Sequence, residues 1–289
     1  MESQPPATTA RGQQQHEAPV MTAPLAPPPC DQPSVEAALK AKRPARERQR
    51  KERFALLHSM TADERRRFLV EEDAQKEQLL RKLERVVAPD STSQRIAIDL
   101  SFDHIMNEKE IRSLANQLKI SYGIVKQMHE PFQLIFCNAN GSLQRLLEGF
   151  GADHWFIQWR HNVDSLDEVF QSSELVYLSP DSPNVLSSMD PKKTYVIGGI
   201  VDKSRKKGAT LNAATQVGIT TARLPIREHI PERLDHILNV NTVVEVLQNF
   251  QELGDWQQAL EKALPQQAVM VDASPTEDVE LLWMEELAL

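Results

Sequence analysis

The sequence predicts an α/β domain with a largely parallel sheet, and three observations support this. Between about residues 94 and 265, short apolar runs typical of buried strands alternate with segments of helical periodicity. The spacing of these runs leaves room for a helix between most successive strands, as parallel pairing requires. The runs also end in polar or acidic residues, such as Asp99 and Asp202. A segment of this length forms one domain of ordinary size.

The expected elements follow in chain order. The strands are 95–103, 132–137, 175–179, 195–201 and 221–225, with a short strand or loop around 155–156. The helical segments are 107–118, 142–150, 165–170, 211–217, 240–250 and 256–264. Gly218 ends the fourth of these helices.

The run 195–201 is the centre of this pattern. It ends at Asp202, and a loop with four basic residues (Lys203, Arg205, Lys206 and Lys207) follows at once. Open α/β sheets bind ligands at the carboxyl ends of their strands, which favours a functional site here. The alternative is a solvated turn capped by Asp202. The adjacent Gly198 and Gly199 indicate close approach to the backbone, either by a ligand or by the protein's own packing.

The amino-terminal third has a different composition. Residues 1–34 are rich in Pro, Gln, Ala and Thr, which predicts a disordered tail. Residues 35–90 use a helical alphabet and carry eight Lys or Arg within 40–53. Thr61 and Glu64 form a capping-box pattern before a second helix. These exposed basic helices form either a solvated linker or an arm that lies along phosphates.

Composition and simple motifs limit the classes of function and cellular location that the sequence allows. The net charge of -8 combines the basic segment with an acidic end, where residues 272–289 hold six acids and no Lys or Arg. Two cysteines give no disulfide framework, and the eight histidines show no metal-ligand spacing. There is no membrane-length apolar run and no secretory signal pattern, so we expect an intracellular protein, nuclear or cytoplasmic. Phosphate-binding glycine motifs and the nucleophile elbow are also absent. Pattern alone therefore names no reaction.

Several ordered segments resemble one known family. The run Y-V-I-G-G-I-V-D-K-S-R-K-K at 195–207 is similar to the signature of the tRNA position-9 N1-purine methyltransferases, a branch of the SPOUT superfamily. Matching segments are 98–103, 113–118, 176–182, 221–226, 238–243 and 255–256. The resemblance covers roughly 94–265, and the basic helices also look like that family's arm. Ser204 stands where relatives often have Asn.

The resemblance implies a SPOUT-type trefoil-knotted domain, placed at 91–270, that binds S-adenosylmethionine in the knot. Backbone groups of three loops would hold the cofactor. The matching positions are Leu178, Gly199, Lys203, Ser204, Arg205, Lys206, Lys207, Thr210, Leu224, His236, Ile237 and Leu238. Family members are typically monomeric. The acidic tail 271–289 lies outside the resemblance and is either solvated or a docking segment.

The resemblance also assigns a chemical role to Asp202. Guanine N1 carries a proton at neutral pH, so its methylation needs a base, and Asp202 is the candidate. Its basic neighbours lower the pKa of such a carboxylate, which weakens the base, but they also stabilise an anionic guanine. Adenine N1 has a free lone pair and needs no base. Guanine is the expected target, with adenine as an alternative.

The expected substrate is tRNA, bound by two groups of residues. Asp99, Asp103 and Gln117 are candidates near the target base, although both acids also suit helix capping. Position 9 lies in the tRNA core, so its nucleotide would leave the stack to react. The tRNA backbone would follow a basic set, namely Lys42, Arg43, Arg46, Arg48, Arg50, Lys51 and Arg53. The rival interpretation is a non-catalytic scaffold that retains the fold and binds structured RNA.

Overall fold

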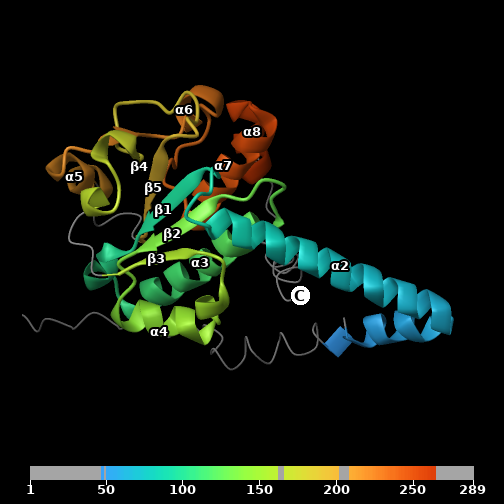
Figure 1. Cartoon of the computed structure of the whole chain (residues 1–289). Helices are drawn as coiled ribbons and strands as arrows, with labels where there is room; N and C mark the ends of the chain where they lie inside the picture. The colour runs from blue at the N-terminus through green and yellow to red at the C-terminus, as the bar shows by residue number, and fades with distance from the viewer. Residues whose placement is uncertain (1–46, 49, 162–165, 202–207, 265–289) are drawn as a thin grey trace, which may run out of the picture. The chain divides into compact units, whose positions relative to one another are not determined.

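The computed structural model describes residues 47–48, 50–161, 166–201 and 208–264 (Figure 1). The chain divides into two compact units, Met1–Ser59 and Met60–Leu289. In the first unit, residues 50–59 are helical. The predicted disordered tail, the acidic tail and Asp202 lie outside the described residues.

A six-stranded parallel sheet organises the second unit, in the order β3-β2-β1-β5-β4-β6. The strands are β1 (Arg95–Asp99), β2 (Gln133–Cys137), β3 (Gln158–Arg160), β4 (Leu175–Leu178), β5 (Thr194–Gly198) and β6 (Thr220–Ala222). The register places Asp99 beside Gly198, and Tyr177 beside Val196. The carboxyl ends of all six strands therefore lie at one edge of the sheet.

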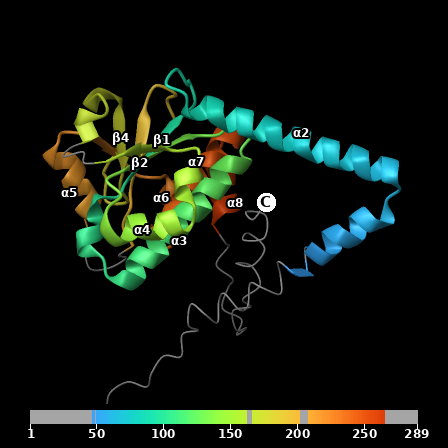
Figure 2. The same ribbon diagram turned by 60° about the horizontal axis from the view of Figure 1, so that its bottom comes forward.

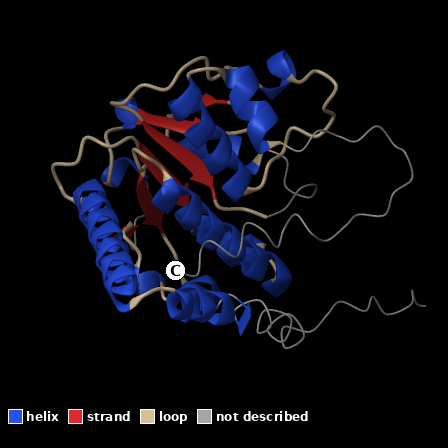
Figure 3. Cartoon of the chain, turned by 90° about the vertical axis from the view of Figure 1, so that its right-hand side faces the viewer, coloured by secondary structure: helices blue, strands red, loops and turns tan. Residues whose placement is uncertain are grey.

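The α-helices are α2 (Ala62–Val87), α3 (Glu108–Gln127), α4 (Gly141–Gly149), α5 (Ala209–Gln216), α6 (Ile226–His229), α7 (Val240–Leu253) and α8 (Trp256–Ala263). Four 3-10 turns join them: η1 (Ser101–Ile105), η2 (Ala152–His154), η3 (Leu166–Glu168) and η4 (Ser172–Glu174). Figure 3 shows helices on both faces of the sheet. None of the described helices is both long and apolar enough to span a membrane.

The alternation of side chains along the strands gives two cores. On one face, residues such as Ile98 and Ile197 pack with Leu114 of α3 and Val244 of α7. On the other face, Ala97, Cys137, Tyr177 and Val196 pack with Ala214 of α5. Nearly continuous burial of the strands is what a parallel sheet covered on both faces requires.

Most predicted elements are confirmed, with shifts at their ends. The strand expected at 95–103 stops at Asp99, because the Asp99 carboxylate accepts a hydrogen bond from the Ser101 N–H and turns the chain into η1. The strand expected at 195–201 ends at Gly198, where the Ile200 N–H bonds back to the Gly198 carbonyl. The helix expected at 107–118 continues to Gln127, with Ser121 and Gly123 buried along it.

Other differences concern short elements. Residues 155–156 are loop, one of the two states expected there, and the third strand follows at Gln158–Arg160. The last strand ends at Ala222 rather than at 225. The segment expected at 165–170 contains only the 3-10 turn η3 among its described residues. The four-residue α6 was not predicted, since one helical turn carries too little periodicity to detect.

The predicted capping box at the start of α2 is confirmed. The Thr61 hydroxyl accepts from the Glu64 N–H, and the Glu64 carboxylate accepts from the Thr61 N–H at 2.8 Å. Most of α2 is exposed, as predicted, and its two buried residues, Leu83 and Val86, belong to its last turns. Figures 1 and 2 show this carboxyl-terminal end next to the sheet. There, the Gln133 amide donates to the Val86 carbonyl at 2.9 Å.

Candidate active site at the carboxyl edge of the sheet

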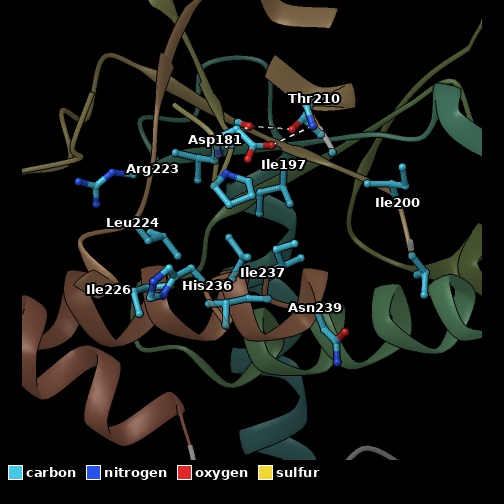
Figure 4. A pocket seen from close by; sticks show the side chains of 18 of the residues that line it. Asp181, Ile197, Ile200, Thr210, Arg223, Leu224, Ile226, His236, Ile237 and Asn239 are labelled. Atoms are coloured by element: carbon cyan, nitrogen blue, oxygen red, sulfur yellow. Dashed lines mark hydrogen bonds between the residues drawn. The ribbon is translucent and has the colours of Figure 1, made fainter. Parts of the chain in front are cut away.

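A pocket opens at the carboxyl edge of β4, β5 and β6 (Figure 4). About 1100 Å³ of space lies within its outline, part of it open to solvent. Its walls come from three parts of the second unit: the loop after β4, the end of β5 with the start of α5, and the segment from the end of β6 into α7. The lining residues are Leu178, Ser179, Pro180, Asp181, Ile197, Gly198, Ile200, Val201, Gly208, Thr210, Arg223, Leu224, Ile226, Arg227, His236, Ile237, Leu238, Asn239 and Val243.

One wall of the pocket is polar, and it joins the loop after β4 to the start of α5. The Thr210 hydroxyl donates to the Ser179 hydroxyl at 2.9 Å, and the Gly208 N–H donates to the Asp181 carboxylate at 2.9 Å. Figure 4 shows Asp181 and Thr210 together at one end of the pocket. Gly208 has φ of 76°, a conformation that favours glycine. These two bonds fix the start of α5 against the loop after β4.

The opposite wall is mainly apolar and comes from the segment after β6. Leu224, Ile226 and Ile237 line it, with His236 beside them in Figure 4. Burial is the main factor that lowers the pKa of His236, and Arg227 adds to the shift, so this imidazole is neutral at pH 7. An apolar wall facing a polar one suits a ligand with a flat base at one end and charged groups at the other.

Arg223 fixes the position of the apolar wall. Its guanidinium makes two hydrogen bonds to the Glu228 carboxylate, at 2.8 and 2.6 Å. The pairing lowers the pKa of Glu228 and raises that of Arg223. The Arg223 backbone also bonds to Asn184 and Leu186. This residue therefore links the segment after β6 to the loop that leads from β4.

Gly198 and Gly199 are required by packing within the protein. A Cβ at Gly198 would lie well inside 3.0 Å of the Thr210 methyl group and 3.3 Å from the Tyr177 hydroxyl. A Cβ at Gly199 would lie 2.5 Å from a Leu100 methyl group and 2.8 Å from the Asp99 carbonyl. Of the two interpretations of this glycine pair, the structure supports the packing one. Gly198 also lines the pocket, so its backbone faces any ligand there.

A family model described as tRNA (guanine(9)-N(1))-methyltransferase TRM10/TRM10A matches residues 34–269. The chain belongs to this family. It is 35% identical over 188 residues to tRNA methyltransferase 10 homolog A of Rattus norvegicus, covering 64% of this chain and 55% of the relative. It is 37% identical over 178 residues to the tRNA (guanine(9)-N1)-methyltransferase of Schizosaccharomyces pombe, covering 60% and 59%. The chain thus spans little more than half the length of these curated TRM10 relatives.

Solved structures of the TRM10 family also resemble this chain. A crystal structure described as full-length spTrm10 in complex with SAH is 36% identical, with a TM-score of 0.55, and the match covers 60% of this chain and 95% of that one. A second, described as spTrm10(74), is 37% identical with a TM-score of 0.55, covering 59% and 94%. The α/β fold of this TRM10 member agrees with these structures.

The structure brings six of the twelve expected TRM10 cofactor residues together. Leu178, Thr210, Leu224, His236, Ile237 and Leu238 all line the pocket. Gly199 lies between the lining residues Gly198 and Ile200. The loop residues Lys203, Ser204, Arg205, Lys206 and Lys207, like Asp202, lie outside the described residues. Asp181, Arg223 and Asn239 also line the pocket; they lie in segments that match the family but were not assigned to the site from the sequence.

The expected substrate residues have clear structural partners. Asp99 is buried, and its carboxylate accepts from Ser101 N–H and the Tyr177 hydroxyl. Asp103 is half-buried in η1, where its carbonyl accepts from the Met106 N–H. Gln117 is buried between α3 and α7, and its side-chain carbonyl accepts from the Val240 N–H at 3.0 Å. Their contact with a target base stays a prediction.

The described part of the basic set lies on exposed helix. Arg48, Arg50, Lys51 and Arg53 are all exposed. Lys51 pairs with Glu47 at 3.0 Å, and Arg48 lies 3.9 Å from Glu52. Such exposed pairs contribute little to stability. Lys42, Arg43 and Arg46 precede the described residues. Among the described residues, no cluster of three or more His, Cys, Asp or Glu side chains suits a metal ion.

Proposed function

We propose that this chain transfers a methyl group from S-adenosylmethionine to N1 of guanine at position 9 of tRNA. The strongest support is the pocket at the carboxyl edge of the sheet, because in this TRM10 family member six of the twelve cofactor positions expected from the resemblance line it. A relative of similar fold is described as a complex with SAH, the form of this cofactor that has lost its methyl group.

The chemistry of the pocket residues fits the cofactor. Leu224, Ile226 and Ile237 would hold the adenine ring, since a flat base binds best against apolar walls. Backbone groups near Gly198, together with the Thr210 and Ser179 hydroxyls, would bind the polar end. When bound, S-adenosylmethionine supplies an electrophilic methyl group. The protein's contribution is to orient the cofactor and to exclude water from it.

Asp202 is the proposed general base. Guanine N1 must lose its proton to accept a methyl group, and a carboxylate in the loop that follows β5 suits this role. The neighbouring Lys and Arg residues of the loop would stabilise the negative charge that develops on the guanine. Asp202 would therefore hold the proton while its basic neighbours hold the anionic base.

The proposed partner is tRNA, bound through its phosphates by the basic helical segment. Exposed Arg and Lys side chains at 48–53 present positive charge at intervals of one or two residues. Contacts of this type neutralise phosphates without reading bases, so affinity falls steeply with salt. We also infer that the chain acts as a monomer inside the cell and carries the SPOUT trefoil knot, as the resemblance implies. Light scattering on the purified protein and the chain trace in an experimental density map test these two points.

Methyl transfer to defined transcripts tests the proposed function. The full chain is incubated with labelled S-adenosylmethionine and with tRNA transcripts that carry G9, A9 or U9, and the product nucleotide is mapped. We expect N1-methylguanine at position 9 in the G9 transcript alone. Methylation of A9 alone would remove the need for a general base and contradict the role of Asp202. Binding of tRNA without methylation of either purine, and without binding of the cofactor, would establish the scaffold function instead.

A further inference from the structure

A buried hydrogen bond crosses the sheet beside the pocket. The Tyr177 hydroxyl in β4 donates to the Asp99 carboxylate in β1 at 2.9 Å. These strands are not neighbours, because β5 lies between them. Both residues lie on the same face of the sheet as Gly198, which pairs directly with Asp99. The bond therefore passes over β5 at Gly198.

Glycine at position 198 is what allows this crossing. A Cβ there would be 3.3 Å from the Tyr177 hydroxyl and 3.7 Å from the Phe102 ring of η1. The same virtual Cβ would overlap the Thr210 methyl group at the start of α5. Side chains of β4, η1 and α5 thus lie close to this one glycine. The Tyr177 hydroxyl and the Thr210 methyl group therefore share the space above the end of β5.

The end of β5 and Thr210 both belong to the pocket, whereas the bonded pair does not. Gly198, Thr210 and Ser179 line the pocket, and the Thr210 hydroxyl bonds to Ser179. Tyr177 and Asp99 are not among the lining residues, and they are 1% and 6% exposed. An effect of this pair on a bound ligand must therefore act through the residues that it holds in place.

We propose that Tyr177 and Asp99 form a positioning pair that sets the geometry of the cofactor pocket by fixing Gly198 and Thr210. This inference rests on the proposed function, since it assumes that the pocket binds S-adenosylmethionine. It differs from a direct substrate role for Asp99. Both carboxylate oxygens accept hydrogen bonds inside the protein, one from Ser101 and one from Tyr177, and Asp99 is buried, which leaves little access for a target base.

The electrostatic environment keeps the pair in its bonded form. Burial and the negative charge of Asp99 raise the pKa of Tyr177 well above its ordinary value, so the hydroxyl remains a donor at all working pH values. The same carboxylate, together with burial, raises the pKa of the adjacent Cys137 thiol to about 12. A charge-assisted hydrogen bond in such surroundings is stronger than a neutral one.

The chain provides a matched control for testing this pair. Tyr177→Phe removes the hydroxyl from the pair. Tyr195→Phe removes another buried tyrosine hydroxyl from the same sheet, where it accepts a hydrogen bond from the Asp190 N–H at 2.7 Å. Tyr195 is also 1% exposed but does not line the pocket. Both substitutions keep the ring and its packing. A difference in SAH affinity between the two variants therefore depends on which hydrogen bond has been lost.

The measurement is SAH binding to the full chain by calorimetry, at a temperature well below the melting point of each variant. We expect Tyr177→Phe to weaken SAH binding by at least about tenfold, which corresponds to the loss of one hydrogen bond to a charged group. Tyr195→Phe should change the affinity by less than about twofold, within the usual effect of a distant site. Equal affinities for the two variants would overturn the proposal. A wild-type chain that binds no SAH would instead refute the proposed function.

Asp99→Asn separates the positioning role from a direct substrate role. Because both residues act through one bond, the double variant Asp99→Asn with Tyr177→Phe should bind SAH within about threefold of Tyr177→Phe alone. Fully additive losses would contradict a shared bond. The positioning role would also be refuted if Asp99→Asn left SAH affinity unchanged but lowered methylation at saturating S-adenosylmethionine. That result would indicate that Asp99 contacts the target base.

Discussion

Replacement of Gly198 by alanine tests the packing at the end of β5 most directly. The added methyl group would overlap the Thr210 methyl group and press on the Tyr177 hydroxyl. Overpacking of a buried site costs about 1–3 kcal/mol, which for a domain of this size lowers the melting temperature by about 2–12 °C. The same displacement moves Thr210, which lines the pocket, so SAH affinity should fall together with stability.

Two further variants make this prediction refutable. Gly149→Ala lies at the end of α4, where an added Cβ meets no atom within 4 Å, so stability should change by less than about 1 kcal/mol. Thr210→Ser removes the overlapping methyl group and keeps the hydroxyl that bonds to Ser179, so it should restore much of the lost stability in the Gly198→Ala background. The assay is thermal unfolding followed by SAH titration. If Gly198→Ala were as stable as Gly149→Ala, or if Thr210→Ser gave no rescue, the packing argument would be wrong.

Three more predictions concern separate parts of the chain. Asp202→Asn should lower the rate of guanine methylation by about 10²–10⁴ at neutral pH without loss of SAH binding, and an unchanged single-turnover rate would exclude it as the base. Because the pKa of the Cys137 thiol is raised to about 12, that thiol should resist alkylation at pH 8 in a folded Cys30→Ser variant and react only after unfolding, as mass spectrometry would show. Burial raises the pKa of Glu245 in the folded chain, so the contribution of this side chain to stability is lost as pH rises through its folded-state pKa. Glu245→Gln should therefore raise the melting temperature more at pH 8 than at pH 4.5. An equal rise at the two pH values would contradict a raised pKa for Glu245.

The sequence was sufficient to predict those features that depend on local pattern. Apolar runs located five strands of a parallel sheet, and Thr61 with Glu64 located the start of α2. Resemblance to a family placed Leu178 and Leu224 at one pocket, although 46 residues separate them along the chain. The strand and helix-start predictions succeed because burial periodicity and capping act over a few residues.

Features that depend on the order of strands were not predictable. The bond between Tyr177 and Asp99 exists only because β5 lies between β4 and β1, and no local pattern states that order. The same limit applies to Gln117, whose polar side chain on a helix gave no sign that it accepts from the first N–H of α7. Arg223 was overlooked because its role depends on Glu228 and Asn184, which come together only in the folded chain.

The two outermost strands affect the behaviour of the chain at high concentration. β3 and β6 form the edges of the sheet, and each is three residues long. Edge strands this short offer little unpaired backbone on which a second molecule can add a strand, so the folded sheet is a poor template for aggregation. The segments most prone to aggregation are the apolar central strands, which become exposed only when the domain unfolds. Loss of soluble protein should therefore follow unfolding and should be slowed by any ligand that stabilises the folded domain.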